Sequence, residues 1–96
     1  MILSEILKKS RENKGLLLRE VASAIGVDTS LISKFEKGER KPTREQILRL
    51  SNSLDIDERL VITVWLSEKI YSEIQDEEFA LDAIEITTKR FKKLTS

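Results

Sequence analysis

The side chains with the clearest chemical purpose are cations clustered in the middle of the chain. Residues 34–44 hold five basic side chains and two acidic ones. Such a cluster is typical of a surface that binds phosphate groups, although a charge run can also be a solvated face. Residues 73–85 hold the opposite charge, with six acidic residues and no basic one. The net charge is therefore +3 in residues 1–45 (ten basic, seven acidic) and −3 in residues 46–96 (seven basic, ten acidic).

Two side chains that enzymes often use in catalysis are missing from the sequence. Cys and His are both absent, which excludes disulfides, thiol nucleophiles, Cys/His zinc sites, Ser-His triads and the usual general base at neutral pH. The sequence also lacks a Gly-rich phosphate loop and a convincing cluster of paired carboxylates. We therefore expect a protein that is not an enzyme, with no catalytic residue, no metal site and no cofactor.

Length and composition favour one small helical domain. The 96 residues, of which 40% are hydrophobic and 35% charged, can build one core with much solvated helix surface. One Pro and three Gly leave few backbone breakers, which favours long helices over short strands. The start of the sequence has no basic segment followed by an apolar run, and no apolar stretch reaches the ~18 residues of a membrane span. We expect an all-α, cytoplasmic protein with no signal peptide and no membrane contact.

The first half of the chain contains three predicted helices, each followed by a glycine. The apolar periodicity places them at residues 3–13, 17–25 and 29–37. Gly15, Gly26 and Gly38 follow their ends, where glycine readily takes a positive φ. Ser4 is a candidate cap for the first helix and Asp28 for the third.

Three further helices are predicted in the second half. Residues 43–46 match a capping box and begin a fourth helix that carries apolar residues to Leu54. Asp57 can cap a fifth helix, which is apolar on almost all sides and is therefore expected to be buried on more than one side. Asp76 is the expected cap of a sixth helix, from residue 77 to about residue 94.

The two short helices at 17–25 and 29–37 have the steric features of a helix-turn-helix motif. Their steep crossing requires a small residue in the first helix, a glycine in the turn four residues later, and apolar residues six and nine positions beyond that glycine. The residues at these positions are Ala22, Gly26, Ile32 and Phe35. The alternative is an αα-hairpin with a Gly turn and no role in DNA binding.

Residues 26–42 resemble the signature of the Cro and phage-repressor family, also called the xenobiotic-response-element family. The resemblance covers residues 3–57 and matches in order at Arg11, Gly15, Leu16, Glu20, Ala22, Gly26, Ile32, Ser33, Glu36, Gly38, Arg40 and Pro42. It implies an all-α fold with a five-helix lambda-repressor-like DNA-binding domain, here residues 1–66, to which residues 67–96 add a C-terminal helix. The run through Trp65-Leu66-Ser67 also resembles small controller proteins encoded beside restriction-modification genes.

The resemblance implies a role for each exposed side chain of the motif. The helix at 29–37 would lie in the major groove. The implied base contacts are Thr29, Ser30, Ser33 and Lys34. The implied phosphate contacts are Arg19, Lys37, Arg40, Lys41 and Arg44. The alternatives are N-capping for Thr29 and Ser30, a hydrogen bond to its own helix for Ser33, and a merely solubilising basic loop.

The sequence departs from the family at the start of the second helix. Members often have Thr or Ser as the cap and a Gln that holds a phosphate, whereas this chain has Leu17 and Leu18. Backbone N–H groups or Arg19 could take over that contact.

The residues that give the motif its structure are all present in the sequence. Arg11 and Glu36 match a partly buried ion pair between the first and third helices, and the remaining members are Ala22, Gly26, Ile32, Phe35 and Gly38.

The C-terminal segment carries an apolar stripe that a minimal domain does not need. Its members recur at 4-3-4-3 spacing and are Ala80, Ile84, Thr87, Phe91 and Leu94. We expect a homodimer with Ile84, Phe91 and Leu94 in its interface, the alternative being a helix that folds back on its own domain. Trp65 and Tyr71 are the next interface candidates.

The sequence thus predicts a dimeric transcriptional regulator, a repressor or controller protein, that binds double-stranded DNA. The alternative is an antitoxin whose acidic residues 73–85 neutralise a basic toxin. The resemblance permits both, because antitoxins often carry this DNA-binding fold.

Overall fold

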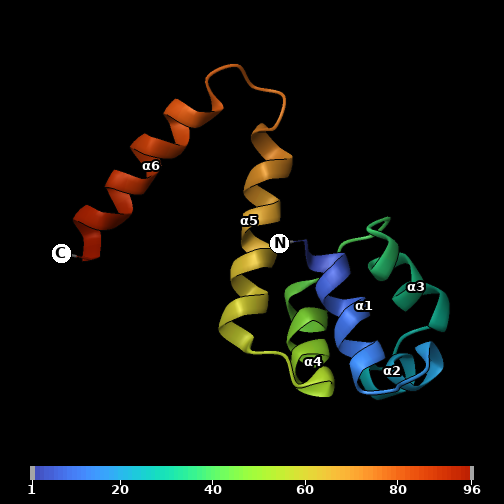
Figure 1. The fold of residues 1–96 in the computed structure, drawn as a ribbon. Helices are drawn as coiled ribbons and strands as arrows, with labels where there is room; N and C mark the ends of the chain where they lie inside the picture. The colour runs from blue at the N-terminus through green and yellow to red at the C-terminus, as the bar shows by residue number, and fades with distance from the viewer. Residues whose placement is uncertain (1, 96) are drawn as a thin grey trace.

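The computed structural model describes residues 2–95, which form six helices and no strand. The helices are α1 (Leu3–Asn13), α2 (Leu18–Ile25), α3 (Thr29–Lys37), α4 (Arg44–Leu54), α5 (Glu58–Ile74) and α6 (Ala80–Thr95). Helices α1 to α4 and the first half of α5 pack into a bundle. Helix α5 continues out of this bundle, and α6 turns away from α5 at an elbow formed by residues 75–79 (Figure 1). The predicted all-α class is confirmed, and none of the described helices is long and apolar enough to cross a membrane.

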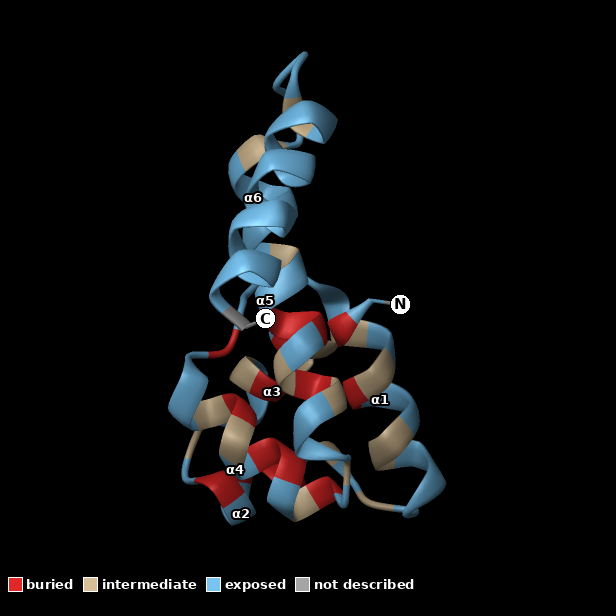
Figure 2. Cartoon of the chain, turned by 90° about the vertical axis from the view of Figure 1, so that its left-hand side faces the viewer, coloured by how far each residue is buried: buried red, intermediate tan, exposed pale blue. Residues whose placement is uncertain are grey.

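The hydrophobic core lies inside the five-helix bundle and ends at Trp65. Helix α3 packs against α1 and α2, and α4 packs against α2 and α5. The buried apolar residues are Leu3, Leu7, Val21, Ala22, Ile25, Ile32, Phe35, Ile47, Leu50, Leu54, Val61, Val64 and Trp65. Figure 2 shows the contrast between this buried bundle and α6, which is exposed along nearly its whole length. The prediction that α5 is buried on more than one side is wrong after Trp65, because Leu66 and Ile70 extend beyond the bundle and are exposed.

Two glycines end α2 and α3 as the sequence predicts. Gly26 and Gly38 have φ angles of 73° and 74°, in the left-handed region. The turn after α2 closes with a hydrogen bond from the N–H of Val27 to the carbonyl of Ala22 at 3.0 Å. A Cβ on Gly26 would meet only the guanidinium of Arg49 at 3.9 Å, an ordinary contact. The backbone conformation, and not lack of space, therefore requires glycine in this turn.

The predicted capping residues of α4 and α5 are confirmed. In the capping box of α4, Gln46 N donates to Thr43 Oγ1 at 3.2 Å, and Thr43 N donates to Gln46 Oε1 at 2.9 Å. At the start of α5, Leu60 N donates to Asp57 Oδ2 at 3.2 Å. These side chains satisfy backbone donors that have no partner within the helix.

The other capping predictions are wrong for Ser4 and Asp76, and for Asp28 the position alone is confirmed. Ser4 does not cap α1, because the helix already begins at Leu3, whose N–H donates to Glu68 Oε2 of α5 at 2.6 Å. Asp28 occupies the N-cap position of α3, but its side chain accepts no capping hydrogen bond. Asp76 does not cap α6, which begins at Ala80 and not at residue 77. Residues 75–79 form turns instead, in which Glu77 N donates to the carbonyl of Ile74 at 3.0 Å.

Candidate nucleic-acid interface

Helices α2 and α3 form the paired element that the sequence predicts. Ala22, Ile32 and Phe35 are each 2% exposed, so the inner faces of both helices are buried in the core. The outer face of α3 is open to solvent, with Thr29, Ser30 and Lys34 exposed and Ser33 half-buried. The core therefore fixes the inner face of a nine-residue helix and leaves a row of polar side chains on its outer face.

None of the four outward polar side chains of α3 makes a hydrogen bond or ion pair with another described residue. Thr29 and Ser30 lie inside the first turn, after the N-cap residue, so the alternative role of N-cap does not apply. Ser33 also lacks a side-chain hydrogen bond to its own helix within residues 2–95. Their donors and acceptors are therefore available to an external ligand.

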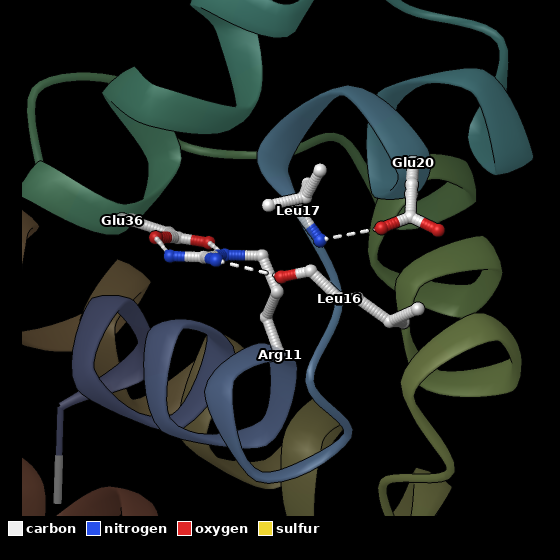
Figure 3. A network of polar contacts seen from close by, with 5 residues as sticks. All are labelled: Arg11, Leu16, Leu17, Glu20 and Glu36. Carbon is white, nitrogen blue, oxygen red and sulfur yellow. Dashed lines mark hydrogen bonds and ion pairs between the residues drawn. The ribbon is translucent and has the colours of Figure 1, made fainter.

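An ion pair between Arg11 and Glu36 fixes α3 against α1 (Figure 3). Arg11 Nε donates to Glu36 Oε2 at 2.7 Å and Arg11 Nη2 donates to Glu36 Oε1 at 3.0 Å, a bidentate arrangement. The side chains of Arg11 and Glu36 are only 14% and 8% exposed. The hydrogen bond to Glu36 raises the pKa of Arg11, while burial of the guanidinium acts in the opposite direction. The pair joins residues 25 positions apart and holds α3 in a defined orientation.

The same arginine also positions the segment that leads into α2. Arg11 Nη1 donates to the carbonyl oxygen of Leu16 at 2.8 Å, and Glu20 Oε1 accepts from the N–H of Leu17 at 2.9 Å (Figure 3). Helix α2 begins at Leu18, one residue later than predicted, and the Leu17 side chain at its N-cap offers no acceptor. Arg19 follows in the first turn and is exposed.

The five candidate phosphate-binding cations fall into two groups. Arg19, Lys37 and Arg40 are exposed and have no hydrogen bond or ion pair within the part of the chain that the structure describes. Lys41 and Arg44 instead contact α5. Lys41 Nζ donates to the carbonyl of Glu68 at 3.3 Å, and the guanidinium of Arg44 lies 5.1 Å from the centroid of the Trp65 ring. All five side chains are on or beside the helix-turn-helix, but only the first group is unpartnered.

Trp65 organises the loop after α3, a role that the sequence did not indicate. Its indole Nε1 donates to the carbonyl of Pro42 at 2.8 Å in a buried hydrogen bond. The Nζ of Lys69 lies 4.2 Å from the ring centroid, so two cations flank one indole. Because the guanidinium of Arg44 is exposed, its contact with the ring contributes about 0.5–1 kcal/mol. Arg44 can therefore leave Trp65 for a phosphate at modest cost.

Arg49 is a second positioning residue that the sequence did not reveal. Its Nη1 donates to the carbonyl of Ile25 at the end of α2 at 3.3 Å, and its Nη2 contacts Glu45 Oε1 at 2.8 Å. The contact with Ile25 spans 24 positions, and no local pattern predicts it.

The fold and the packing of α2 against α3 define a helix-turn-helix protein. Residues 7–61 match the family model described as helix-turn-helix, so this chain belongs to that family, and the resemblance to Cro and phage repressors is confirmed. Domains of this kind place the second helix of the motif in the major groove of DNA.

Among known proteins, the chain is similar to YqaE of Bacillus subtilis (strain 168), an uncharacterized HTH-type transcriptional regulator. The two are 29% identical over 70 residues, which is 73% of this chain and 60% of that relative. The match therefore spans less than two thirds of the relative's length.

Proposed function

We propose that this chain is a DNA-binding transcriptional regulator, a repressor or controller protein, that reads the major groove with α3 as a homodimer. The observation that carries the proposal is the outer face of α3, where Thr29, Ser30 and Lys34 are exposed and unpartnered on a helix whose inner face is buried. Residues 1–66 would bind DNA, and residues 67–96 would join two copies. Membership of the helix-turn-helix family and the similarity to a transcriptional regulator support this function.

Base recognition would rest on a lysine and three hydroxyl groups. Lys34 can donate to O6 and N7 of guanine, whereas Thr29, Ser30 and Ser33 can pair with several bases. A good direct contact discriminates by about 1–3 kcal/mol per base pair. Because no Arg, Asn or Gln occurs in α3, one copy would discriminate weakly. A second copy about 34 Å away, one turn of DNA, would double the number of base pairs read.

Phosphate contacts would supply affinity and position. Arg19, Lys37 and Arg40 are exposed beside α3 and have no competing partner among the described residues. Lys41 and Arg44 would add contacts by leaving the α5 carbonyl and the indole that they approach. Each phosphate neutralised releases counterions, so affinity should fall steeply with salt.

The experiment that tests the proposal begins with selection of duplexes from a random library by the full chain at low salt. Binding of the selected duplex is then measured by fluorescence anisotropy for the wild type, for Thr29→Ala and for Lys8→Ala, a matched control on the exposed face of α1. Thr29→Ala should lose preference for the selected duplex while Lys8→Ala keeps it. Failure of the library to yield any duplex preferred over random DNA would refute the proposal.

The alternative function is an antitoxin, and one observation favours it. All six acidic side chains in residues 73–85 are exposed. A basic toxin could bind there by charge complementarity. Sedimentation of the purified chain separates the two functions, since a dimer stable without a partner supports the regulator, and a monomer that binds a basic protein encoded beside it supports the antitoxin.

A further inference from the structure

A cluster of cations surrounds Trp65 and lies partly outside the helix-turn-helix motif. The Nζ of Lys69 in α5 is 4.2 Å from the centroid of the indole ring, and the guanidinium of Arg44 is 5.1 Å from the same centroid. Lys41 approaches the same stretch of α5, where its Nζ donates to the carbonyl of Glu68 at 3.3 Å. Three exposed cations, from the loop after α3, from α4 and from α5, therefore meet at one turn of α5.

No carboxylate pairs with any of these three cations within residues 2–95. The acidic residues beside them in the sequence make other contacts. Glu45 accepts from Arg49 at 2.8 Å, and Glu68 Oε2 accepts from the N–H of Leu3 at 2.6 Å. Glu73, one turn further along α5, is exposed and forms no ion pair in that part of the chain either. Like charges that gather without a counterion attract an anion from outside.

The indole ring holds two of the cations without cancelling their charge. Trp65 is only 5% exposed and its Nε1 donates to the carbonyl of Pro42 at 2.8 Å, so the ring is fixed in place. An aromatic ring attracts a cation through its quadrupole but carries no net charge. Arg44 and Lys69 thus keep their full charge and give up part of their freedom before a ligand arrives. Groups ordered in advance lose less entropy on binding.

We infer, on the basis of the proposed function, that Lys69 binds a phosphate of the DNA backbone next to one that Arg44 binds. The cluster is continuous with the proposed interface, because Lys41 lies in the loop after α3 and Arg44 begins α4. A DNA strand supplies successive phosphates, so neighbouring cations can each bind one. The match to the family model ends at residue 61, so family membership assigns no role to Lys69. The interface would extend in this way from the helix-turn-helix onto α5.

An open site of this kind suits a polymer better than a free anion. The side chains of Arg44 and Lys69 are exposed, so water and salt weaken their attraction for a small ion. When α3 and Arg40 hold a duplex, the next phosphates of the strand are present at the cluster at a high effective concentration. A free phosphate lacks that advantage. The occupant is therefore a phosphate of bound DNA.

Salt titrations of DNA binding test the role of Lys69. Binding of the selected duplex is measured by fluorescence anisotropy at several salt concentrations for the wild type, Lys69→Gln, Lys69→Arg and Arg59→Gln. The last variant removes the same charge from an exposed position in the first turn of α5. Each phosphate contact contributes about 0.9 to the slope of log affinity against log salt on B-DNA. Lys69→Gln should lower the slope by about that amount, Lys69→Arg should restore it, and Arg59→Gln should leave it unchanged.

Duplexes with single neutral phosphates locate the contact. Methylphosphonate groups replace the backbone phosphates of the selected duplex one at a time. At one position the neutral group should weaken binding by the wild type and have no effect on binding by Lys69→Gln. An unchanged salt slope for Lys69→Gln, or the absence of such a position, would overturn the inference and leave the proposed function intact. If the wild type prefers no duplex over random DNA, the proposed function and the contact fail together.

Inorganic phosphate separates bound DNA from a free anion as the occupant. Trp65 is the only tryptophan of the chain, so its fluorescence reports on the cluster. At constant ionic strength, inorganic phosphate should give no saturable change in this fluorescence. A saturable change that Lys69→Gln abolishes would overturn the inference in favour of a site for a free anion.

Discussion

Replacing Glu36 by Gln should remove the negative charge from the ion pair that fixes α3. The substitution keeps the shape of the side chain but leaves the Arg11 guanidinium, which is only 14% exposed, without its paired carboxylate. Loss of one partner of a fully buried pair costs about 3–5 kcal/mol. Because both side chains here keep some contact with water, we expect about 2–3 kcal/mol. For a domain of this size that corresponds to a fall in Tm of roughly 10–20 °C.

Thermal and urea unfolding followed by circular dichroism measure this loss. The matched control is Glu39→Gln in the loop after α3, which removes the same charge from an exposed side chain and should change the free energy of unfolding by less than about 0.5 kcal/mol. A double variant, Arg11→Met with Glu36→Leu, removes both charges and should recover part of the stability. Its recovery is incomplete because the carbonyl of Leu16 loses its donor.

The effect of Glu36→Gln should not depend on the protonation of Arg11. The hydrogen bond to Glu36 raises the pKa of Arg11. A raised pKa on a cation stabilises the folded state at every pH below the unfolded-state pKa, and that stabilisation is lost only as the pH rises through the folded-state pKa. Both values lie far above neutral pH for arginine. The difference in stability between wild type and Glu36→Gln should therefore be equal at about pH 7 and about pH 9.

Two results would refute this reasoning. One is a loss no larger than that of Glu39→Gln, which would mean that the ion pair contributes little in spite of its bidentate geometry. The other is additivity of the single variants Arg11→Met and Glu36→Leu in the double variant, because residues that interact directly show coupling energies of about 0.5–3 kcal/mol.

Three further predictions concern DNA binding and association. Arg40→Ala should lower the slope of log affinity against log salt by about one on selected and random duplexes alike, whereas Lys8→Ala should leave the slope unchanged in the same titrations. Lys34→Ala should cost about 1–3 kcal/mol of discrimination at one or two base pairs, and an equal loss on random DNA would reduce it to a positioning contact. Ile84→Glu combined with Phe91→Glu should give a folded, helical monomer with reduced affinity for the selected duplex. Sedimentation measures the oligomeric state and circular dichroism the helix content. A double variant that stays dimeric would place the interface elsewhere.

The features that could be predicted from the sequence are those set by neighbouring residues. The positive φ at Gly26 and the capping box at Thr43 are requirements of the local backbone, so the C-terminal end of α2 and the start of α4 were predictable. Asp76 is a good cap in isolation, yet residues 75–79 form turns and α6 begins later. The sequence names a cap former but does not show that Asp76 lies in a turn after α5, which the hydrogen bond from Glu77 N to the carbonyl of Ile74 closes.

The candidate interface was predictable in its residue types and less so in its contacts. The buried positions of the motif follow from the steric pattern around Gly26. The association of Arg44 with Trp65 and of Lys41 with Glu68 links residues more than 20 positions apart, and local periodicity carries no information on such contacts. The direction of α6 could not be predicted from the sequence either. The core ends at Trp65, and the apolar stripe of α6 does not indicate which surface the helix faces.

Helix α5 connects the half of the molecule that we propose for DNA binding to the half that we propose for association. Its Trp65 donates to the carbonyl of Pro42 in the loop after α3, and the carboxylate of its Glu68 accepts from the N–H of Leu3 in α1. The loop and α1 both pack near α3, which Glu36 fixes by its ion pair. The orientation of α3 is thus tied to α5 by short, directional contacts. If two α6 helices pair about a fixed axis, only the elbow at residues 75–79 remains to adjust the separation of the two α3 helices. The spacing of half-sites that the dimer accepts should therefore be set at that elbow.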